Sequence, residues 1–213
     1  MEGDAVDTGD NAMTGGRLAA DAITAALETE LDVDVVLSSE NDQILREGLK
    51  FSARSHKRPK HLASDTATTI AVVTDVLNTT EDTPKLVIVL QPTSPFRTKE
   101  NVIEAIVLAE KQDCDSLISV CETSDEILKS FCINSDGYAE GVYTDDAPFS
   151  PRQILPKVYK ANGAIFITKP SVIKYKNRLY GESLIPYIMA QENSLDIDSL
   201  EDLIGLNFKL FED

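Results

Sequence analysis

Two aspartates spaced one residue apart, Asp196 and Asp198, are the first residues in this chain that could do chemistry. Alternate side chains of an extended segment point the same way, so the two carboxylates could share one divalent cation. Proteins hold Mg²⁺ with one or two carboxylates together with substrate phosphates, so the pair predicts a site for a phosphorylated substrate. The alternative is that Asp198 caps the following helix and Asp196 is an ordinary surface charge.

Arg58 opens a second polar group. Pro59 restricts the backbone beside it, and the guanidinium fork suits a phosphate or the carbonyl of a base. The segment Ser64–Thr69 follows with hydroxyls and backbone N–H groups at the predicted start of a helix, which is a favourable place for an anion. Asp65 or Thr66 is the expected cap of that helix.

A third group follows the apolar run Lys85–Leu90, which predicts a buried strand. The next residues, Gln91 to Arg97, contain two prolines and therefore form a stiff polar loop. In open α/β sheets, ligands bind at the carboxyl ends of strands, so Gln91 is a candidate binding residue with both a donor and an acceptor.

Five motifs in this order resemble the acylneuraminate cytidylyltransferases, the enzymes that make CMP-sialic acid and related CMP-nonulosonates. Each motif alone is weak, but the five together cover roughly residues 17 to 213. They are RPKHLASDTATT (58–69), LQPTSPFR (90–97), PRQ (151–153), NGAIFI (162–167) and SLDIDSLEDL (194–203).

The resemblance implies transfer of CMP from CTP to a sialic, legionaminic or pseudaminic type of sugar, with release of pyrophosphate. It implies that Asp196 and Asp198 are the catalytic pair that binds Mg²⁺. The nucleotide would be bound by Arg58, Ala67 and Thr69. Sugar-binding roles fall on Gln91, Lys129, Arg152, Lys160, Asn162 and Phe166.

Two of these positions depart from the family pattern. Phe166 stands where Tyr is commoner, which removes a hydroxyl. Lys160 stands where some members carry Arg, and a lysine offers a point charge in place of a bidentate fork.

The family's glycine-rich basic loop, which holds the triphosphate, has no counterpart ahead of the first predicted helix. Only Met13–Arg17 precedes it, with two glycines and one cation. We expect either a family member that is truncated or altered at its N-terminus, or a degenerate pseudoenzyme that binds a sugar acid or an intact partner. In both cases little activity is expected of the chain as written. A nucleotide-sugar glycosyltransferase, which also uses an Asp-x-Asp pair, is a further alternative.

Apolar periodicity predicts alternating helices and strands, and hence an α/β fold with three layers and a mostly parallel sheet. The resemblance implies the nucleotide-diphospho-sugar transferase type of fold, with the family's first strand missing. Helices are predicted at 18–31, 43–54, 66–77, 99–111, 170–175 and 199–208. Strands are predicted at 33–38, 85–90, 116–120, 164–168 and 184–189.

The chain divides into an acidic head, residues 1–16, that we expect to be disordered, and one domain over residues 17–213. Residues 1–47 hold twelve acidic side chains but only two cations, Arg17 and Arg46. An excursion at about 131–159, rich in Gly and Pro, interrupts the domain. Family membership implies a homodimer in which this excursion crosses to the partner.

Composition excludes several classes of function. The net charge of −16 argues against a nucleic-acid partner, because phosphate binding needs a basic surface. No apolar run is long enough for a membrane span, so we expect no membrane partner and a cytoplasmic location.

The three cysteines have no metal-binding spacing and predict buried thiols. His56 and His61 lack a nucleophile signature, and we expect both at the surface.

Overall fold

The computed structural model describes residues 8–29, 31–64 and 66–197. It is an α/β protein, as predicted, with five α-helices and eight strands in the described part. The helices are α1 (Thr8–Leu27), α2 (Asp42–Lys50), α3 (Thr69–Leu77), α4 (Lys99–Gln112) and α5 (Pro170–Lys176). The strands are β1 (Val36–Ser39), β2 (Arg54–Lys57), β3 (Val87–Val89), β4 (Ser116–Thr123), β5 (Phe131–Ile133), β6 (Ala139–Gly141), β7 (Val158–Thr168) and β8 (Leu184–Ile188).

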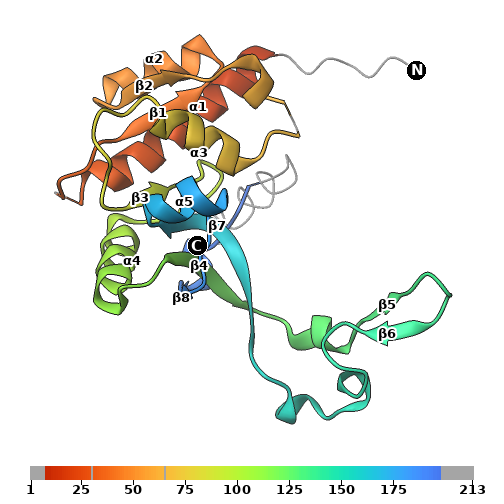
Figure 1. The fold of residues 1–213 in the computed structure, drawn as a ribbon. Coiled ribbons are helices and arrows are strands. Elements are labelled where there is room, and N and C mark those ends of the chain that lie inside the picture. Colours follow the sequence, from red (N-terminus) through yellow and green to blue (C-terminus); the bar gives the residue numbers. More distant parts are fainter. Residues whose placement is uncertain (1–7, 30, 65, 198–213) are drawn as a thin grey trace, which may run out of the picture.

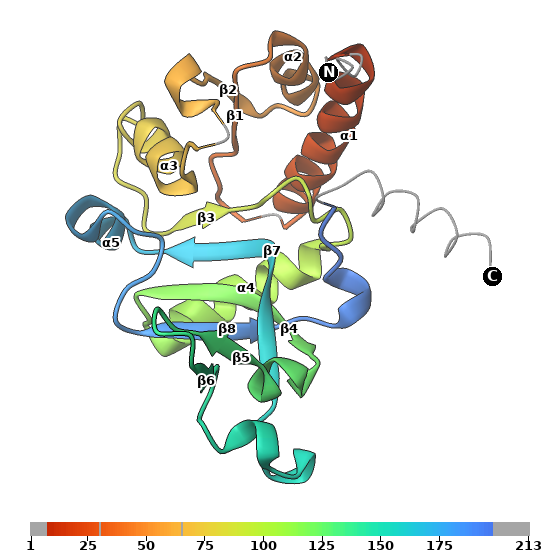
Figure 2. The same cartoon turned by 90° about the vertical axis from the view of Figure 1, so that its right-hand side faces the viewer.

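The main sheet has four strands in the order β3-β7-β4-β8. β7 runs antiparallel to both of its neighbours, whereas β4 and β8 are parallel. Three of the four strands therefore point the same way, and the sheet is mixed. The reversal of β7 follows from the excursion, which leaves after β4 and returns as the long strand beside it (Figure 2).

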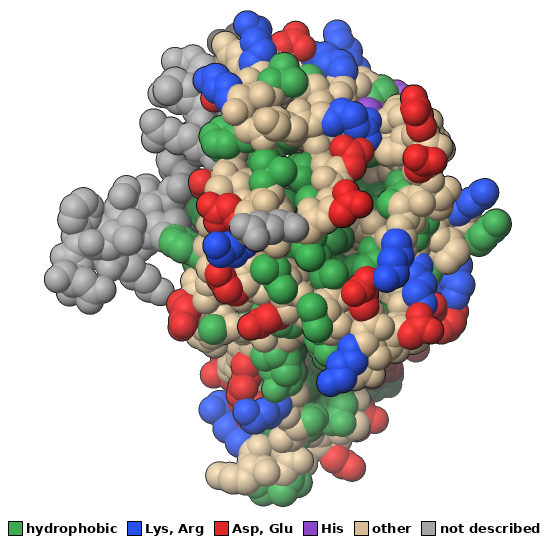
Figure 3. Space-filling model, turned by 90° about the vertical axis from the view of Figure 1, so that its left-hand side faces the viewer, with side chains coloured by type: hydrophobic (Ala, Val, Ile, Leu, Met, Phe, Trp, Pro, Cys, Tyr) green, Lys and Arg blue, Asp and Glu red, His purple; other side chains and the backbone are tan. Residues whose placement is uncertain are grey.

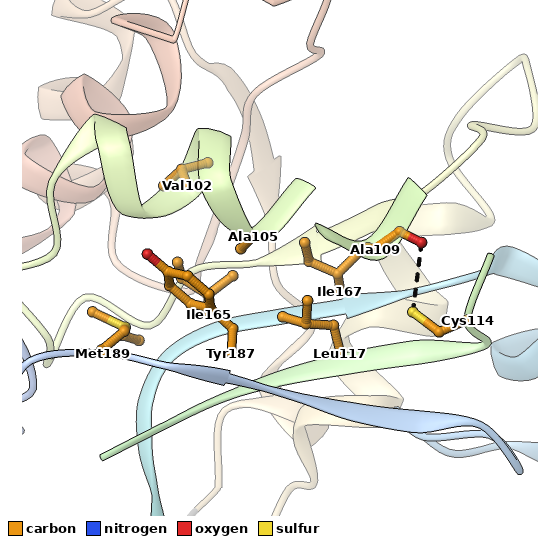
Figure 4. Packing of buried hydrophobic residues seen from close by; sticks show 10 residues of the cluster. Val102, Ala105, Ala109, Cys114, Leu117, Ile165, Ile167, Tyr187 and Met189 are labelled. Atoms are coloured by element: carbon orange, nitrogen blue, oxygen red, sulfur yellow. Dashed lines mark hydrogen bonds between the residues drawn. The ribbon is translucent and has the colours of Figure 1, made fainter. Parts of the chain in front are cut away.

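The hydrophobic core lies between α4 and this sheet (Figure 4). Leu117 and Ile167 are paired across β4 and β7, and both are almost fully buried beneath the Ala105 and Ala109 positions of α4. Small residues on the helix allow it to approach the sheet closely. On the opposite face of the sheet, Ile118 and Phe166 are half-buried by the described residues, whereas Ser116 and Thr168 are buried.

β1 and β2 form a separate, parallel two-stranded sheet. Leu37 of β1 contacts α2, where a side chain at Gly48 would collide with it. The next residue, Ser38, faces the opposite side and pairs with His56, which contacts α3. Helices therefore cover both faces of this small sheet, as Figure 1 shows.

Several predicted boundaries change. Helix α1 begins at Thr8, so residues 8–16 are helical although we expected disorder through residue 16; residues 1–7 lie outside the described range. Helix α2 ends at Lys50 because Ser52 has a left-handed backbone (φ 62°), and the unpredicted strand β2 follows. Helix α3 begins at Thr69 and its cap is Thr68, whose hydroxyl accepts a hydrogen bond from the Ala71 amide.

The excursion projects from the body of the molecule (Figure 1). It contains the short antiparallel pair β5–β6 and ends where β7 begins at Val158. The helix predicted at 199–208 lies outside the described residues. Among the residues that are described, no helix is long and apolar enough to cross a membrane.

Candidate functional site

The loop after β3 is fastened to β7 by buried polar groups. Arg97 is 5% exposed, and its Nη1 donates to the Gln91 carbonyl at 3.1 Å and to the Ala164 carbonyl at 2.7 Å. Ser94, which is fully buried, donates through Oγ to the Asn162 carbonyl at 3.2 Å. Burial lowers the pKa of Arg97 to about 10. This clamp fixes the position from which the Gln91 side chain extends.

Gly163 is the point at which the loop, β7 and the C-terminal segment meet. It has a left-handed backbone (φ +71°) and is buried. A Cβ at this position would lie 2.6 Å from Gln91 Oε1 and 3.0 Å from Asp196 Oδ2. The absence of a side chain at Gly163 therefore lets a neutral amide and a carboxylate converge at one place. The Ile197 amide, which donates to the Thr93 carbonyl at 2.8 Å, holds the C-terminal segment there.

Asp196 keeps one carboxylate oxygen without a partner. Its Oδ1 is buried and makes no hydrogen bond with any of the residues that the structure describes, although the residue is half-buried overall. A buried carboxylate oxygen with no donor is costly unless a cation, a proton or a ligand group meets it. Asp196 is therefore not an ordinary surface charge, and the arrangement fits the Mg²⁺ site predicted from sequence.

Asp198, the predicted second ligand, lies outside the described residues. Within the part of the chain that the structure describes, no three His, Cys, Asp or Glu side chains are grouped to hold a metal. A site for Mg²⁺ would therefore draw on Asp196 and on substrate oxygens.

Asn162 is placed differently from its predicted role in sugar binding. Only 2% of it is exposed, and its amide serves the protein interior. Oδ1 accepts from Ser119 Oγ at 2.6 Å and from the Ala164 amide at 3.3 Å. Nδ2 donates to Ser194 Oγ at 2.9 Å and to the Met189 sulfur at 3.3 Å. Since all four hydrogen-bonding positions are occupied, Asn162 positions the strand beside Gly163 and has no group free for a sugar.

The predicted nucleotide residues lie at the ends of β2 and α3. Arg58 donates from Nη2 to the Ser38 carbonyl at 2.8 Å, and its side chain is 28% exposed. The Ala67 amide is used in a turn with the Ser64 carbonyl at 2.9 Å, so it is not free for a base. Thr69 is exposed at the first position of α3.

The predicted cations lie at separate places along the excursion and the segments that flank it. Lys129 is half-buried, Lys160 is exposed on β7, and Arg152 is 60% exposed with Nη2 3.7 Å from Glu126 Oε1. No hydrogen bond or ion pair among the described residues joins them, or Arg58, to the Gln91–Asp196 cluster. Phe166 contributes to the half-buried face of the sheet between Val89 and Ile118.

Sequence reasoning gave no individual role to four residues that build the site, namely Arg97, Ser119, Gly163 and Ser194. Arg97, Gly163 and Ser194 lie inside the quoted motifs, whereas Ser119 lies in a predicted strand and carried no local signal. His56, expected at the surface, is 8% exposed and contacts Ser38 and Asp75. Of the cysteines, Cys114 and Cys121 are buried as predicted, whereas Cys132 is exposed.

A hollow of about 250 Å³ lies between α1 and the start of α4. Asp21 and Glu28 line it from α1, and Arg97 and Lys99 line it from the other side. It contains none of the site residues predicted from sequence, although Arg97, which fastens the loop after β3, is part of its lining.

No family model matches the chain. The CMP-N,N'-diacetyllegionaminic acid synthase of Legionella pneumophila is 30% identical over 208 residues, which cover 94% of this chain and 87% of that protein. The N-acylneuraminate cytidylyltransferase of Streptococcus agalactiae serotype V is 29% identical over 193 residues. That match covers 90% of this chain but 46% of the relative, so the chain spans less than half of its length.

Among solved structures, the CMP:2-keto-3-deoxy-manno-octonic acid synthetase complexed with CTP superposes with a TM-score of 0.64. It is 11% identical, and the match covers 92% of this chain and 88% of that one. This likeness confirms the predicted fold, and the legionaminic acid synthase confirms the predicted family. The chain belongs to the acylneuraminate cytidylyltransferase family.

Proposed function

We propose that this chain is a cytidylyltransferase of the CMP-nonulosonate synthetase type. The anomeric 2-hydroxyl oxygen of a sialic-acid-like sugar forms a bond to the α-phosphorus of CTP. The bond from that phosphorus to the bridging oxygen of the β-phosphate breaks, pyrophosphate leaves, and the hydroxyl proton passes to water. Such a reaction depends mainly on positioning and on neutralising phosphate charge.

The observation that carries this proposal is the convergence of Gln91 and Asp196 on Gly163, with Asp196 Oδ1 buried and partnerless. Gln91 offers an amide to sugar hydroxyls, and Asp196, with Asp198, would hold Mg²⁺. When bound, Mg²⁺ supplies positive charge beside the triphosphate. The clamp formed by Arg97 and Ser94 keeps the Gln91 loop in place without touching substrate.

Arg58 and Thr69 are the proposed contacts for the nucleotide, and Lys129, Arg152 and Lys160 for the sugar carboxylate. The homodimer belongs to the same proposal. The excursion exposes large hydrophobic side chains, including Phe149 (81%), Tyr138 (72%), Ile154 (70%) and Ile133 (69%). The narrow lower part of the molecule in Figure 3 shows such side chains at its surface. A second copy would cover them.

Pyrophosphate release from CTP, Mg²⁺ and each of three sugars (sialic, legionaminic and pseudaminic acid) tests the proposal. We expect one of them to support release, and Asp196→Asn to lower the rate at least a hundredfold. The same variant should be as stable as the wild type or more so, since the partnerless buried oxygen no longer carries charge. Asp32→Asn, at an exposed position, is the control and should change neither property.

A second candidate function is the binding of a sugar acid without turnover. It is favoured because the β1–β2 pair and the main sheet are separate sheets. No described strand joins the two. Calorimetric binding of a nonulosonic acid without any pyrophosphate release would support this candidate. A variant that carries a family-type strand and glycine-rich basic loop ahead of helix α1 should then gain turnover.

A further inference from the structure

His56 lies buried between two side chains from different elements. Its Nδ1 is 3.0 Å from Ser38 Oγ on β1, and its Nε2 is 3.2 Å from Asp75 Oδ2 on α3. Only 8% of His56 is exposed, against 32% of the Asp75 side chain. One imidazole therefore ties α3 to the two-stranded sheet.

For a neutral His56, the chemistry of the groups gives the direction of these hydrogen bonds. The Asp75 carboxylate can only accept, so Nε2 of a neutral His56 carries the proton. Nδ1 is then an acceptor and takes the hydroxyl proton of Ser38. The lone pairs of Ser38 Oγ are left to accept, and Arg58 Nε lies 3.4 Å away. The three donors that link the series, namely Arg58 Nε–H, the Ser38 hydroxyl and His56 Nε2–H, each have an acceptor.

The same serine residue holds the guanidinium a second time, because Arg58 Nη2 donates to the Ser38 carbonyl at 2.8 Å. Two of the five N–H groups of Arg58 are thus engaged. The nearest carboxylate, Glu40 Oε2, lies 3.9 Å from Nη1 and does not complete a close ion pair. The remaining N–H groups, on a side chain that is 28% exposed, are available to a ligand.

We propose that His56 and Asp75 are positioning residues that act through Ser38 to hold the Arg58 guanidinium ready for the nucleotide. This inference rests on the proposed function, in which Arg58 binds CTP. A free arginine loses much rotamer freedom when it binds a ligand, and a guanidinium held in advance loses less. The buried histidine also orients the Ser38 hydroxyl. Asp75 selects the His56 tautomer in which Nδ1 accepts from Ser38, which leaves the lone pairs of Ser38 Oγ for Arg58.

A serine, a histidine and an aspartate in series also resemble a nucleophilic triad, but the geometry disfavours that role. Ser38 Oγ is shared with the Arg58 side chain, and the Ser38 carbonyl beside it is bonded to the same guanidinium. The series ends on a partly exposed cation, so the group available to a ligand is Arg58.

Ser38→Ala and Ser39→Ala form a matched pair of variants. Both remove one hydroxyl from β1. The Ser39 Oγ accepts from the Asn41 amide at 3.1 Å, and Ser39 meets Arg58 only through its backbone carbonyl, which accepts from the Arg58 amide at 2.9 Å and is kept in the alanine variant. His56→Gln is a second variant, which keeps an amide near the Nε2 position but offers Ser38 no acceptor. Thermal unfolding of each variant identifies any that fails to fold.

Nitrogen-15 NMR of the Arg58 Nε–H group tests the arrangement without reference to turnover. We expect its exchange with water to be slow in the wild type and in Ser39→Ala, and at least about fivefold faster in Ser38→Ala and His56→Gln. Equal exchange rates in all four proteins would overturn the inference, whether or not the chain makes a CMP-sugar.

Calorimetric CTP binding then tests the consequence. Ser38→Ala should raise the dissociation constant about three- to tenfold, and Ser39→Ala should leave it unchanged. In an Arg58→Ala background, Ser38→Ala should have no further effect. An undiminished effect in that background would mean that Ser38 acts elsewhere, which rejects the positioning role. Failure of the wild type to bind CTP would count against the proposed function alone, because the exchange measurement still decides the arrangement.

Discussion

Gly163 and Asp196 approach so closely that a Cβ on Gly163 would lie 3.0 Å from Asp196 Oδ2. The same atom would lie 2.6 Å from Gln91 Oε1, and the left-handed φ of +71° is itself unfavourable for alanine. We expect Gly163→Ala to abolish pyrophosphate release and to lower the free energy of unfolding by about 2–4 kcal/mol. Urea unfolding and the CTP assay measure the two effects.

Gly137 provides a matched control for this substitution. It also has a positive φ (+84°), but a Cβ there would meet nothing within 4 Å. Gly137→Ala should therefore show only the backbone cost, about 1 kcal/mol, with activity retained. Equal effects of the two substitutions would mean that the contacts with Gln91 and Asp196 are unimportant.

The elements that carry the loop could be predicted because their signals are local. The apolar run at β3 and the cap at Thr98, which forms a full capping box with Asn101, specify a strand, a loop and a helix. Strand β2 could not be predicted, because Arg54–Lys57 contains no apolar residue and the turn before it depends on the backbone of Ser52. Its position depends on pairing with β1, which lies 18 residues earlier.

The residue types of the candidate site could be predicted from sequence, but the arrangement of their side chains could be predicted less well. The spacing of Asp196 and Asp198 indicated a cation site, but only the fold shows that Asp196 Oδ1 is buried without a partner. Asn162 could not be assigned from sequence, since its partners Ser119 and Ser194 lie 43 and 32 residues away. Local motifs report the residue types of a site, and long-range contacts decide which of them face a ligand.

Asn162 should therefore behave as a buried structural residue. Asn162→Ala removes the partners of Ser119 and Ser194 and leaves a cavity, so we expect a loss of about 3 kcal/mol in urea unfolding. Asn193→Ala removes a single hydrogen bond, from Nδ2 to the Phe96 carbonyl, and should cost about 1 kcal/mol. If Asn162→Ala were fully stable but unable to bind a nonulosonic acid, the direct sugar contact would be correct after all.

Tyr187 makes the stability of the core depend on pH in the alkaline range. Its hydroxyl donates to Glu104 Oε2 at 2.6 Å and accepts from Asn101 Nδ2 at 3.2 Å. Burial, followed by the hydrogen bond to Glu104, raises the pKa of Tyr187 to about 12, against about 10 for an unfolded tyrosine. The unfolded state therefore releases the proton first as the pH rises. This contribution to stability is complete below about pH 10 and is lost as the pH rises through about 12.

Tyr187→Phe should accordingly flatten the dependence of the urea midpoint on pH above pH 10, and lower the midpoint at pH 8. It should also remove the 295 nm absorbance step centred near pH 12. Tyr175→Phe, at a side chain that is 77% exposed, is the control and should leave the midpoint unchanged at pH 8. An unaltered step near pH 12 in Tyr187→Phe would show that another group titrates there.

The excursion should make the protein a dimer. Phe149 is 81% exposed and meets Phe131 edge to face, with 6.2 Å between the ring centroids, so the two rings form an apolar surface on the excursion. We expect light scattering to give a dimer at tens of micromolar, and Phe149→Asp to give a monomer, because an unpaired carboxylate would be buried at the contact. Val107→Asp, on the outer side of α4 and 57% exposed, is a matched control that should stay dimeric.

If the partner's excursion helps to close the sugar site, Phe149→Asp should also raise the KM for the nonulosonic acid more than the KM for CTP. A strict monomer in the wild type would mean that the protein does not form this dimer. Dimers in both variants would mean that the contact lies elsewhere.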